Sequence, residues 1–285
     1  MLRVRQIDSF ELPELQPYRT MRRQMEHRKL GIFVAEGEKV VRRLLESKFG
    51  VSSVLLPAKW LEKLRPQLEA RAEEAQVFVA EKSLLETLTG FSMYQGLLAV
   101  GKIPEQHSIA DILARSPRPR LLVAADGLTS AENLGALVRN CAAFGAHALL
   151  TGETSTDPFL RRAVRSSMGA VFELPIVGTA NLVKELRGLS ESGFRCIAAH
   201  PHVERRMVEQ ADFSGDCCIV FGSEGYGINA AVLQVCQDAV AIPMSQKVDS
   251  LNVGSAAAVF LYEAARQRRS IKGQNHGWAE SFRGR

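Results

Sequence analysis

Three short polar segments interrupt the apolar second half of this 285-residue sequence. They are 133–139 (Asn-Leu-Gly-Ala-Leu-Val-Arg), 222–227 (Gly-Ser-Glu-Gly-Tyr-Gly), and 242–244 (Ile-Pro-Met) leading into 250–252 (Ser-Leu-Asn). Each follows an apolar run, and its glycines or amides are typical of a turn before a helix. Loops that follow parallel strands converge on one crevice of an open α/β sheet, where small molecules bind. The sequence therefore predicts that these segments form one binding site.

Common binding motifs do not account for the three segments. The glycines at 222, 225 and 227 lack the spacing of a dinucleotide-binding loop, and the sequence contains no P-loop. The run His200-Pro-His202 and the pair Cys217-Cys218 make a weak zinc site, because adjacent cysteines in a strand point to opposite faces. We therefore predict that no metal ion is bound.

Hydrolytic chemistry is equally poorly supported. Ser250 has no histidine near it in the sequence, so a Ser-His-Asp arrangement is not indicated. Glu224 could act as a catalytic acid or base, but a helix-entry carboxylate that accepts backbone N–H groups is an equally good interpretation. The polar residues at these positions therefore need another explanation.

Short apolar strands alternate with helices through the second half of the chain. Strands are predicted over 120–125, 148–151, 171–175, 195–199, 216–222 and 239–242, and helices over 133–144, 158–167, 182–190, 229–236 and 252–266. Strands rich in Val, Ile and Leu that are separated by helices or long loops pack as a buried parallel sheet. We predict a parallel-sheet α/β domain over 120–270.

The first half indicates a second, smaller domain. Strands over 31–37, 51–56, 77–80 and 95–100 alternate with helices over 39–45, 60–75 (broken near Pro66) and 83–88, which predicts an α/β/α domain over 30–102. Residues 1–29 are expected to form a basic N-terminal arm, extended as far as 18, and a helix. Residues 103–119, with three prolines and a short helix at 109–114, form a predicted linker, and 271–285 a flexible tail.

Charge and cysteine usage narrow the class of protein. The formal net charge is +5, and its cations cluster, notably at Arg19, Arg22, Arg23, Arg28 and Arg165. Clustered cations can follow a nucleic-acid backbone, although solvated helix faces are an equally good explanation. The odd number of cysteines, mostly in apolar runs, predicts reduced thiols in a cytoplasmic protein. No apolar run approaches the ~20 residues that span a bilayer.

Together, the three polar segments resemble the three motifs of the SpoU (TrmH) branch of the SPOUT RNA methyltransferases. The matching residues are Asp126, Asn133, Gly135, Ala136 and Arg139, then Gly222, Glu224, Gly225 and Gly227, and then Ile242, Pro243, Met244, Ser250, Leu251 and Asn252. Residues 165–170 also resemble a stretch of this family, so the resemblance covers about 120–268. Residues 33–37 and 94–99 resemble the opening and closing strands of a ribosomal-protein-L30e-like substrate-binding domain.

The resemblance implies a C-terminal SPOUT domain with a deep trefoil knot, in which loops 221–227, 242–247 and 251–252 clasp S-adenosylmethionine. It also implies methyl transfer to a ribose 2′-hydroxyl of RNA, and a homodimer formed through the knotted domain. The accessory N-terminal domain favours ribosomal RNA as the substrate. A tRNA 2′-O-methyltransferase, or a non-catalytic RNA-binding or ribosome-assembly factor with this fold, remains an alternative. A base methyltransferase fits the first and third motifs less well.

The resemblance also assigns roles to residues. Arg139 would be catalytic; because a guanidinium is a poor base, we expect it to orient the ribose-phosphate and to stabilise the developing alkoxide. The expected positioning residues are Asn133, Glu224, Ser250 and Asn252, the cofactor-binding residues are Gly222, Ile242, Met244 and Leu251, and the RNA-binding residues are Arg19, Arg22, Arg23, Arg28 and Arg165. One departure is Ser130-Ala131, where many members have Asp-Pro. Without the proline, a less rigid loop is expected.

Overall fold

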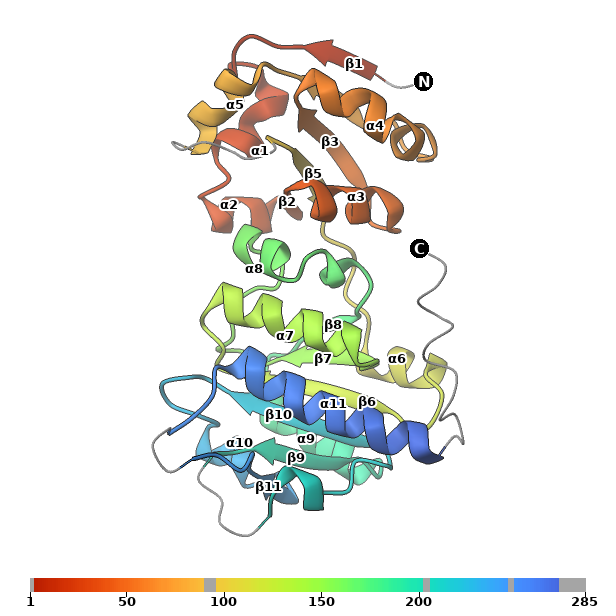
Figure 1. The fold of residues 1–285 in the computed structure, drawn as a ribbon, viewed down its shortest axis with the longest axis vertical. Coiled ribbons are helices and arrows are strands. Elements are labelled where there is room, and N and C mark those ends of the chain that lie inside the picture. The colour runs from red at the N-terminus through yellow and green to blue at the C-terminus, as the bar shows by residue number, and fades with distance from the viewer. Residues whose placement is uncertain (1–2, 90–95, 202–205, 246–248, 272–285) are drawn as a thin grey trace. The chain divides into compact units, whose positions relative to one another are not determined.

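The computed structural model describes residues 3–89, 96–201, 206–245 and 249–271. The chain forms two compact units, Met1–Glu105 with Asp157–Glu173, and Gln106–Thr156 with Leu174–Arg285. Each unit has its own sheet with helices packed against it (Figure 1). The predicted fold class, a smaller N-terminal sheet followed by a parallel C-terminal sheet, is confirmed.

The sheet of the first unit is mixed and has the strand order β1-β4-β3-β5-β2. The strands are β1 (Arg3–Gln6), β2 (Ile32–Glu36), β3 (Val51–Leu56), β4 (Gln76–Val79) and β5 (Leu98–Lys102). The helices of this unit are α1 (Gln16–Arg19), α2 (Gln24–Lys29), α3 (Glu38–Glu46), α4 (Ala58–Glu69), α5 (Lys82–Thr89) and α8 (Arg161–Ser166). Strand β5 runs antiparallel to both β2 and β3, whereas β1, β3 and β4 are parallel. The last of these helices, α8, comes from the segment 157–173, which lies within the predicted C-terminal domain.

Residues 3–18 are packed into this unit, so the predicted extended arm is wrong. Strand β1 pairs with the edge of β4, and Leu15 and Tyr18 are fully buried. The Tyr18 hydroxyl shares a buried hydrogen bond of 2.8 Å with the Ser53 hydroxyl of β3. The side chains of β1 are exposed while its backbone is paired. Its mixed composition therefore gave no sign of a strand.

Helix α4 also differs from its prediction. It passes through Pro66 without a break, although proline cannot donate the usual backbone hydrogen bond, because Trp60, Leu64 and Leu68 bury one face of the helix. The helix ends at Glu69 instead of continuing to 75. Beyond it, the Arg71 guanidinium donates to carbonyls at the end of α3, including that of Leu45 at 2.6 Å. A cation is favourable at a helix C-terminus, and this contact takes the chain out of α4.

The second unit contains a six-stranded sheet in the order β11-β9-β10-β6-β7-β8, and every neighbouring pair is parallel. The strands are β6 (Leu121–Asp126), β7 (Ala148–Thr151), β8 (Ile176–Gly178), β9 (Arg195–Ala199), β10 (Cys217–Gly222) and β11 (Asp238–Val240). The predicted strand 171–175 is wrong, because Gly169 adopts φ +85° and starts a 3₁₀ turn at 170–172. Strand β8 follows that turn.

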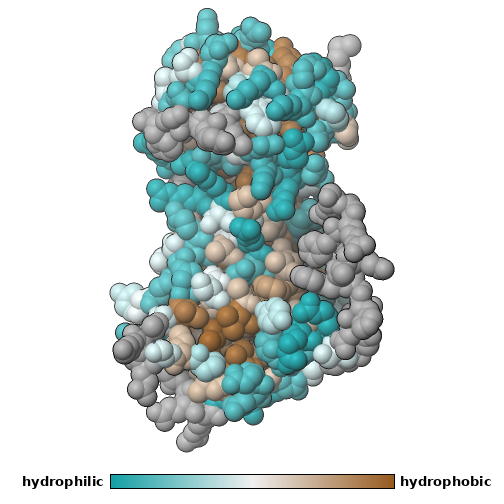
Figure 2. Space-filling model, viewed as in Figure 1, coloured by the Kyte–Doolittle hydropathy of each residue, from teal (hydrophilic) through white to brown (hydrophobic). Residues whose placement is uncertain are grey.

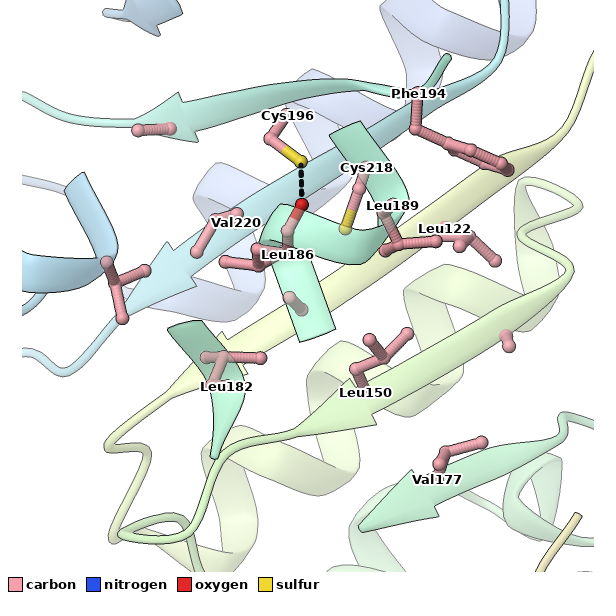
Figure 3. Close-up of a cluster of buried hydrophobic side chains, with 14 of the residues drawn as sticks. Leu122, Leu150, Val177, Leu182, Leu186, Leu189, Phe194, Cys196, Cys218 and Val220 are labelled. Carbon is pink, nitrogen blue, oxygen red and sulfur yellow. Dashed lines mark hydrogen bonds between the residues drawn. The ribbon is translucent and has the colours of Figure 1, made fainter. Parts of the chain in front are cut away.

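The core of the second unit is formed by strand side chains under one layer of helices. Figure 3 shows Leu122, Leu150, Cys218 and Val220 of the strands facing Leu186 of α9 (Leu182–Glu191). Helix α6 (Ile109–Arg115), from the predicted linker, packs on the same core. Helix α10 (Ala230–Leu233) is shorter than the predicted 229–236. The parallel sheet is therefore buried on this face, as its apolar strands require.

Two further helices, α7 (Ala131–Ala143) and α11 (Val253–Ile271), pack against each other (Figure 1). The Asn140 side chain donates to the Gly254 carbonyl at 2.6 Å, and a side chain at Gly254 would meet the Ala136 Cβ at 3.0 Å. The glycine therefore allows the two helices to approach closely.

The path from β11 to α11 passes through residues 246–248, which lie outside the described residues, so the trefoil crossing stays an expectation from the family resemblance. The predicted tail, apart from Ile271, also lies outside them. Among the described helices, none is long and apolar enough to cross a membrane.

Candidate functional site

A cavity of about 290 Å³ lies in the second unit where β9, β10 and β11 end. Its lining comes from 199–201, 221–228, Val240, Ile242, Met244, Ser250, Leu251, Val253, Ala256 and Phe260. The structure thus brings together the predicted residues Gly222, Glu224, Ile242, Met244, Ser250 and Leu251. They come from two segments, the loop after β10 and the connection from β11 to α11, which meet at one edge of the sheet.

A tight turn forms one wall of the cavity. The backbones of Ser223 and Gly227 exchange two hydrogen bonds of 3.0 and 2.9 Å, which closes the loop 223–227. Gly222 lies against the closing end of that loop, and a Cβ there would be 2.2 Å from the Gly227 carbonyl carbon. Atoms cannot approach so closely. Glycine at 222 is therefore required by this turn.

The cavity has an apolar floor and a polar rim. Phe221 and Phe260 are buried with their rings packed edge to face, while Ile242 and Met244 are half-buried. Glu224 and Ser250 are exposed at the rim. Such a combination suits a ligand that has a flat apolar part and a polar part.

Side-chain hydrogen bonds connect the three motif segments. The Asn133 amide of α7 donates to the Glu224 carboxylate, and its oxygen accepts a hydrogen bond of 3.0 Å from the Asn252 amide. The Asn252 oxygen in turn accepts from the backbone N–H of Gly254 at 2.9 Å. Asn133 therefore uses both ends of its amide, which fixes its orientation. Asn133 and Asn252 do not line the cavity themselves but hold Glu224 at its rim.

Ser130 compensates for the departure from the family pattern at 130–131. Its hydroxyl oxygen caps α7 by accepting a hydrogen bond of 3.3 Å from the Asn133 backbone N–H. Ala131, at the first helical position, is buried. Serine is a preferred capping residue. The loop therefore has a fixed entry into α7 without proline.

Asp126 supports the site from beneath the turn. It pairs in register with Gly222 across β6 and β10, and its carboxylate accepts a hydrogen bond of 2.6 Å from the Asn229 backbone N–H. Burial raises the pKa of Asp126, and the nearby negative charge of Glu153 raises it further. The carboxylate anchors the chain directly after the turn 223–227.

Arg139 is not part of the cavity within one chain. It is exposed on α7 and has no hydrogen bond or ion pair with any residue that the structure describes. It directly precedes Asn140, whose side chain contacts α11. Arg139 therefore lies next to the surface where α7 and α11 meet.

The predicted RNA-binding cations all belong to the first unit, and each has an acidic or other partner. Arg19 pairs with Glu11 at 3.6 Å, Arg23 with Glu26 at 3.3 Å, Arg28 with Asp157 at 2.6 Å, and Arg165 with Glu36 at 3.0 Å, while Arg22 also has an interaction. The side chains of Arg23 and Arg165 are still 69% and 60% exposed. Among the four cations in these ion pairs, these two have the most surface left for an external anion.

Several lining residues were missed in the sequence. His200 and Pro201 line the cavity because β9 ends beside β10, and the rule for strand ends that selected the three motifs would have found them too. Tyr226 lay within a recognised motif but drew no separate prediction. Phe260 looked like any other core residue of a helix, so its sequence position gave no signal.

Comparison with known proteins places these loops in a family context. Residues 120–262 match the model of the SpoU rRNA Methylase family. An uncharacterised tRNA/rRNA methyltransferase of Mycobacterium tuberculosis is 34% identical over 244 residues, which cover 84% of this chain and 83% of that protein. The 23S rRNA (guanosine-2′-O-)-methyltransferase RlmB of Shewanella oneidensis is 31% identical over 220 residues, 76% and 89% of the two chains.

Solved structures show the same similarity across both units. The crystal structure of an RNA 2′-O ribose methyltransferase matches with a TM-score of 0.77 and 28% identity, covering 93% of this chain and 99% of that chain. The SpoU methyltransferase AviRb from Streptomyces viridochromogenes matches with a TM-score of 0.76 and 26% identity, covering 92% and 98%. The similarity therefore includes the N-terminal unit as well as the parallel sheet.

Proposed function

Because this chain belongs to the SpoU rRNA methylase family, we propose that the cavity at the strand ends holds S-adenosylmethionine beside the ribose of an RNA substrate. The activity is S-adenosylmethionine-dependent methyl transfer to a ribose 2′-hydroxyl of RNA. One observation carries the assignment of this site: the second and third motif segments line a single cavity, and Asn133 of the first is joined to them by hydrogen bonds with Glu224 and Asn252.

The residues of the cavity fit the cofactor. Pockets for small ligands begin at roughly 300 Å³, close to the observed volume, and combine apolar walls with a few polar groups. We assign the adenine to the walls formed by Ile242, Met244 and Leu251. Gly222 leaves the backbone free of a side chain where the cofactor lies against it. The bound cofactor supplies an electrophilic methyl group, and the protein residues position the hydroxyl that receives it.

The acceptor hydroxyl must be oriented and must lose its proton. Glu224 is held at the rim by Asn133, so it has a fixed position from which to orient the ribose. Ser250, exposed at the same rim, is assigned to the same task. Arg139 would bind the adjacent phosphate and stabilise the developing alkoxide, and the proton would pass to a phosphate oxygen or to solvent. A guanidinium is too weak a base to take that proton.

Arg139 does not line the cavity of its own chain, so this role requires a second chain to supply the guanidinium. The exposed face of α11 supports such a homodimer. Ser255, Val259 and Tyr262 are exposed at helical spacing on α11, beside α7. Figure 2 shows an apolar area over the first part of α11. We propose that this face packs against its counterpart in a second copy. The guanidinium of one chain would then complete the cavity of its partner.

Ribosomal RNA is the substrate that we propose, with tRNA as the alternative. The N-terminal unit, shared with solved family members, adds the exposed cations Arg23 and Arg165. Clustered cations favour a phosphate backbone, and the similarity to RlmB favours 23S rRNA. We place the enzyme in the cytoplasm, which agrees with free cysteines that are mostly buried.

The role of Arg139 is tested with Arg139→Ala, using total RNA from cells that lack the gene as substrate and 2′-O-methyl mapping as the readout. Methyl transfer should fall roughly 100- to 1000-fold, typical of losing a transition-state contact, while calorimetry shows unchanged S-adenosylmethionine binding. Arg187→Ala is the matched control, because Arg187 is an exposed arginine of α9 in the same unit. Full activity in Arg139→Ala would contradict the role. No cofactor binding by the wild type would instead favour a non-catalytic RNA-binding factor.

A mixing experiment tests whether Arg139 acts in the partner's site. Chains carrying Arg139→Ala keep an intact cavity, whereas chains carrying Gly222→Ala keep Arg139. Random mixed dimers would be half heterodimers with one complete site each, so co-expression should restore about a quarter of wild-type activity. If Arg139 acts within its own chain, the mixture should stay inactive.

A further inference from the structure

Tyr226 is nearly free of protein contacts. Its exposed fraction is 98%, compared with 66% for Leu30 and 52% for Tyr262, the next most exposed large hydrophobic side chains of the described residues. Tyr226 nevertheless lies on the rim of the cavity. A tyrosine ring gains from burial, and here the folded chain supplies none of it. The ring is therefore available to a molecule that approaches the cavity from solvent.

The backbone that carries the ring is held in place. The Tyr226 N–H donates to the Ser223 hydroxyl at 3.1 Å, within the loop closed by the two hydrogen bonds between Ser223 and Gly227. Gly227 has φ +67°, and Gly222 packs against the closed end of the loop. The loop thus presents an exposed ring on a fixed base. Preorganisation of this kind lowers the entropy lost on binding.

Tyr226 lines the same cavity as the motif residues assigned to the reaction. Glu224, two residues before it in the same turn, receives the Asn133 amide and so connects the turn to the first motif. The cavity also has apolar lining residues that are removed from solvent, including buried Phe221 and half-buried Ile242. The cofactor can bury its adenine against these residues without using the exposed ring of Tyr226.

RNA supplies a partner that suits an exposed aromatic ring. A ribose whose 2′-hydroxyl enters the cavity carries a base, and its neighbouring nucleotides must leave a regular helical stack to reach the rim. Proteins receive such unstacked bases on aromatic side chains, and stacking tolerates any base because each has a π-face. A tyrosine beside the entrance is therefore placed to hold a base while the ribose enters.

We propose that Tyr226 is a nucleobase-stacking site that positions the RNA nucleotide at the methylation site. The inference rests on the proposed function, because it requires RNA at the mouth of this cavity. Tyr226 acts on substrate binding and leaves both the cofactor and the dimer unchanged. The hydroxyl of the tyrosine is not needed for stacking.

The test compares four variants of the full-length enzyme on total RNA from cells that lack the gene. Tyr226→Phe and Tyr226→Trp keep an aromatic ring and should retain activity within about threefold. Tyr226→Ala should raise the KM for RNA about tenfold, the effect expected for one lost base stack. Tyr226→Leu keeps apolar bulk without a π-face and should behave like Tyr226→Ala. Calorimetry with S-adenosylmethionine and sedimentation of the dimer should give wild-type results for all four.

Tyr226→Trp adds a direct readout, since its indole fluorescence should be quenched by RNA relative to the wild type treated in the same way. An active wild type with an unchanged KM in Tyr226→Ala would overturn the inference and leave the proposed function intact. Weaker binding of S-adenosylmethionine by Tyr226→Ala would assign the ring to the cofactor instead. Activity equal to wild type in Tyr226→Leu would show that apolar bulk suffices and would also overturn base stacking. An inactive wild type that binds no cofactor would reject the proposed function itself.

Discussion

The two units use their polar residues in opposite ways. In the first, the Glu36 carboxylate at the end of β2 is buried and accepts hydrogen bonds from Arg161 and Arg165 of α8. The buried guanidinium of Arg71 likewise donates its hydrogen bonds to backbone carbonyls within the unit. In the second, the strands end in a turn whose Glu224 and Tyr226 are exposed at the rim of a cavity.

This difference separates stability from binding. A buried charge must be paired inside the protein. The Glu36 cluster, formed by Glu36, Arg161 and Arg165, therefore holds α8 against the first sheet and presents no carboxylate to a ligand. At the rim of the cavity, by contrast, the polar groups are exposed to solvent. Its glycines have no side chains, which leaves room for a ligand. Both units are α/β structures, so the layer arrangement alone does not decide which becomes a site.

Gly222→Ala should produce the largest effect, because it disrupts the cavity of the second unit. The added Cβ would lie 2.2 Å from the Gly227 carbonyl carbon, so the turn must shift and the cavity wall with it. We expect the affinity for S-adenosylmethionine to fall at least about 1000-fold, ~4 kcal/mol. Isothermal titration calorimetry measures it.

Gly225→Ala is the matched control for this turn. A Cβ at Gly225 meets nothing within 4 Å, and the residue is exposed. Its affinity for S-adenosylmethionine should stay within about twofold of the wild type, because no backbone has to move. Equal losses in both variants would mean that any change in the loop is harmful and that the close approach at Gly222 is not the cause.

Glu36→Gln should produce the next largest effect, because it disrupts the buried ion pairs of Glu36 with Arg161 and Arg165 in the first unit. The side chain of Arg161 is only 19% exposed, so it would lose its anionic partner while remaining largely buried. We expect the free energy of unfolding to fall by about 3 kcal/mol, measured by urea denaturation. Binding of S-adenosylmethionine should be unchanged, because the cavity belongs to the other unit.

Glu26→Gln provides the surface comparison for Glu36→Gln. Glu26 pairs with Arg23 at 3.3 Å, but both side chains are about half exposed or more. The free energy of unfolding should therefore change by less than about 0.5 kcal/mol. A similar cost for both variants would refute the idea that burial makes the Glu36 cluster important.

The smallest effect concerns the buried thiol of Cys196. It lies in β9, one of the strands at whose ends the cavity is found. Burial, with a smaller contribution from Cys217, raises the pKa of Cys196 from 9.0 to about 11. An acid whose folded pKa is raised contributes stability below its ordinary pKa and loses it as the pH rises towards the folded value. The contribution of Cys196 to the free energy of unfolding should therefore fall by about 1 kcal/mol between about pH 9 and pH 10.

Cys196→Ala isolates that contribution. The variant is expected to lose some stability at neutral pH from the smaller side chain, and its unfolding free energy should decline less steeply above about pH 9 than that of the wild type. Urea denaturation at each pH gives both values. Identical slopes for the two proteins would show that the Cys196 thiol ionises as easily in the folded chain as in the unfolded one.

Much of the second unit could be predicted from the sequence because its signals are local. Continuous apolar runs mark buried strands such as 148–151 and 195–199, which the structure reproduces without a shift. Glycine and amide residues directly after such strands marked the loops of the cavity. Local signals failed where long-range contacts decide: β1 becomes a strand only by pairing with β4, and α4 ends where Arg71 reaches α3.

The sequence by itself determined which residues carry the chemistry, because the types of the motif residues and their spacing can be read directly from it. Only the tertiary structure decided how they are used. It joined Asn133, Glu224 and Asn252 across more than ninety residues of sequence, left Tyr226 exposed, and kept Arg139 out of its own cavity. The physical reason is that hydrogen bonding and burial depend on which segments meet in space, and a local pattern does not contain that information.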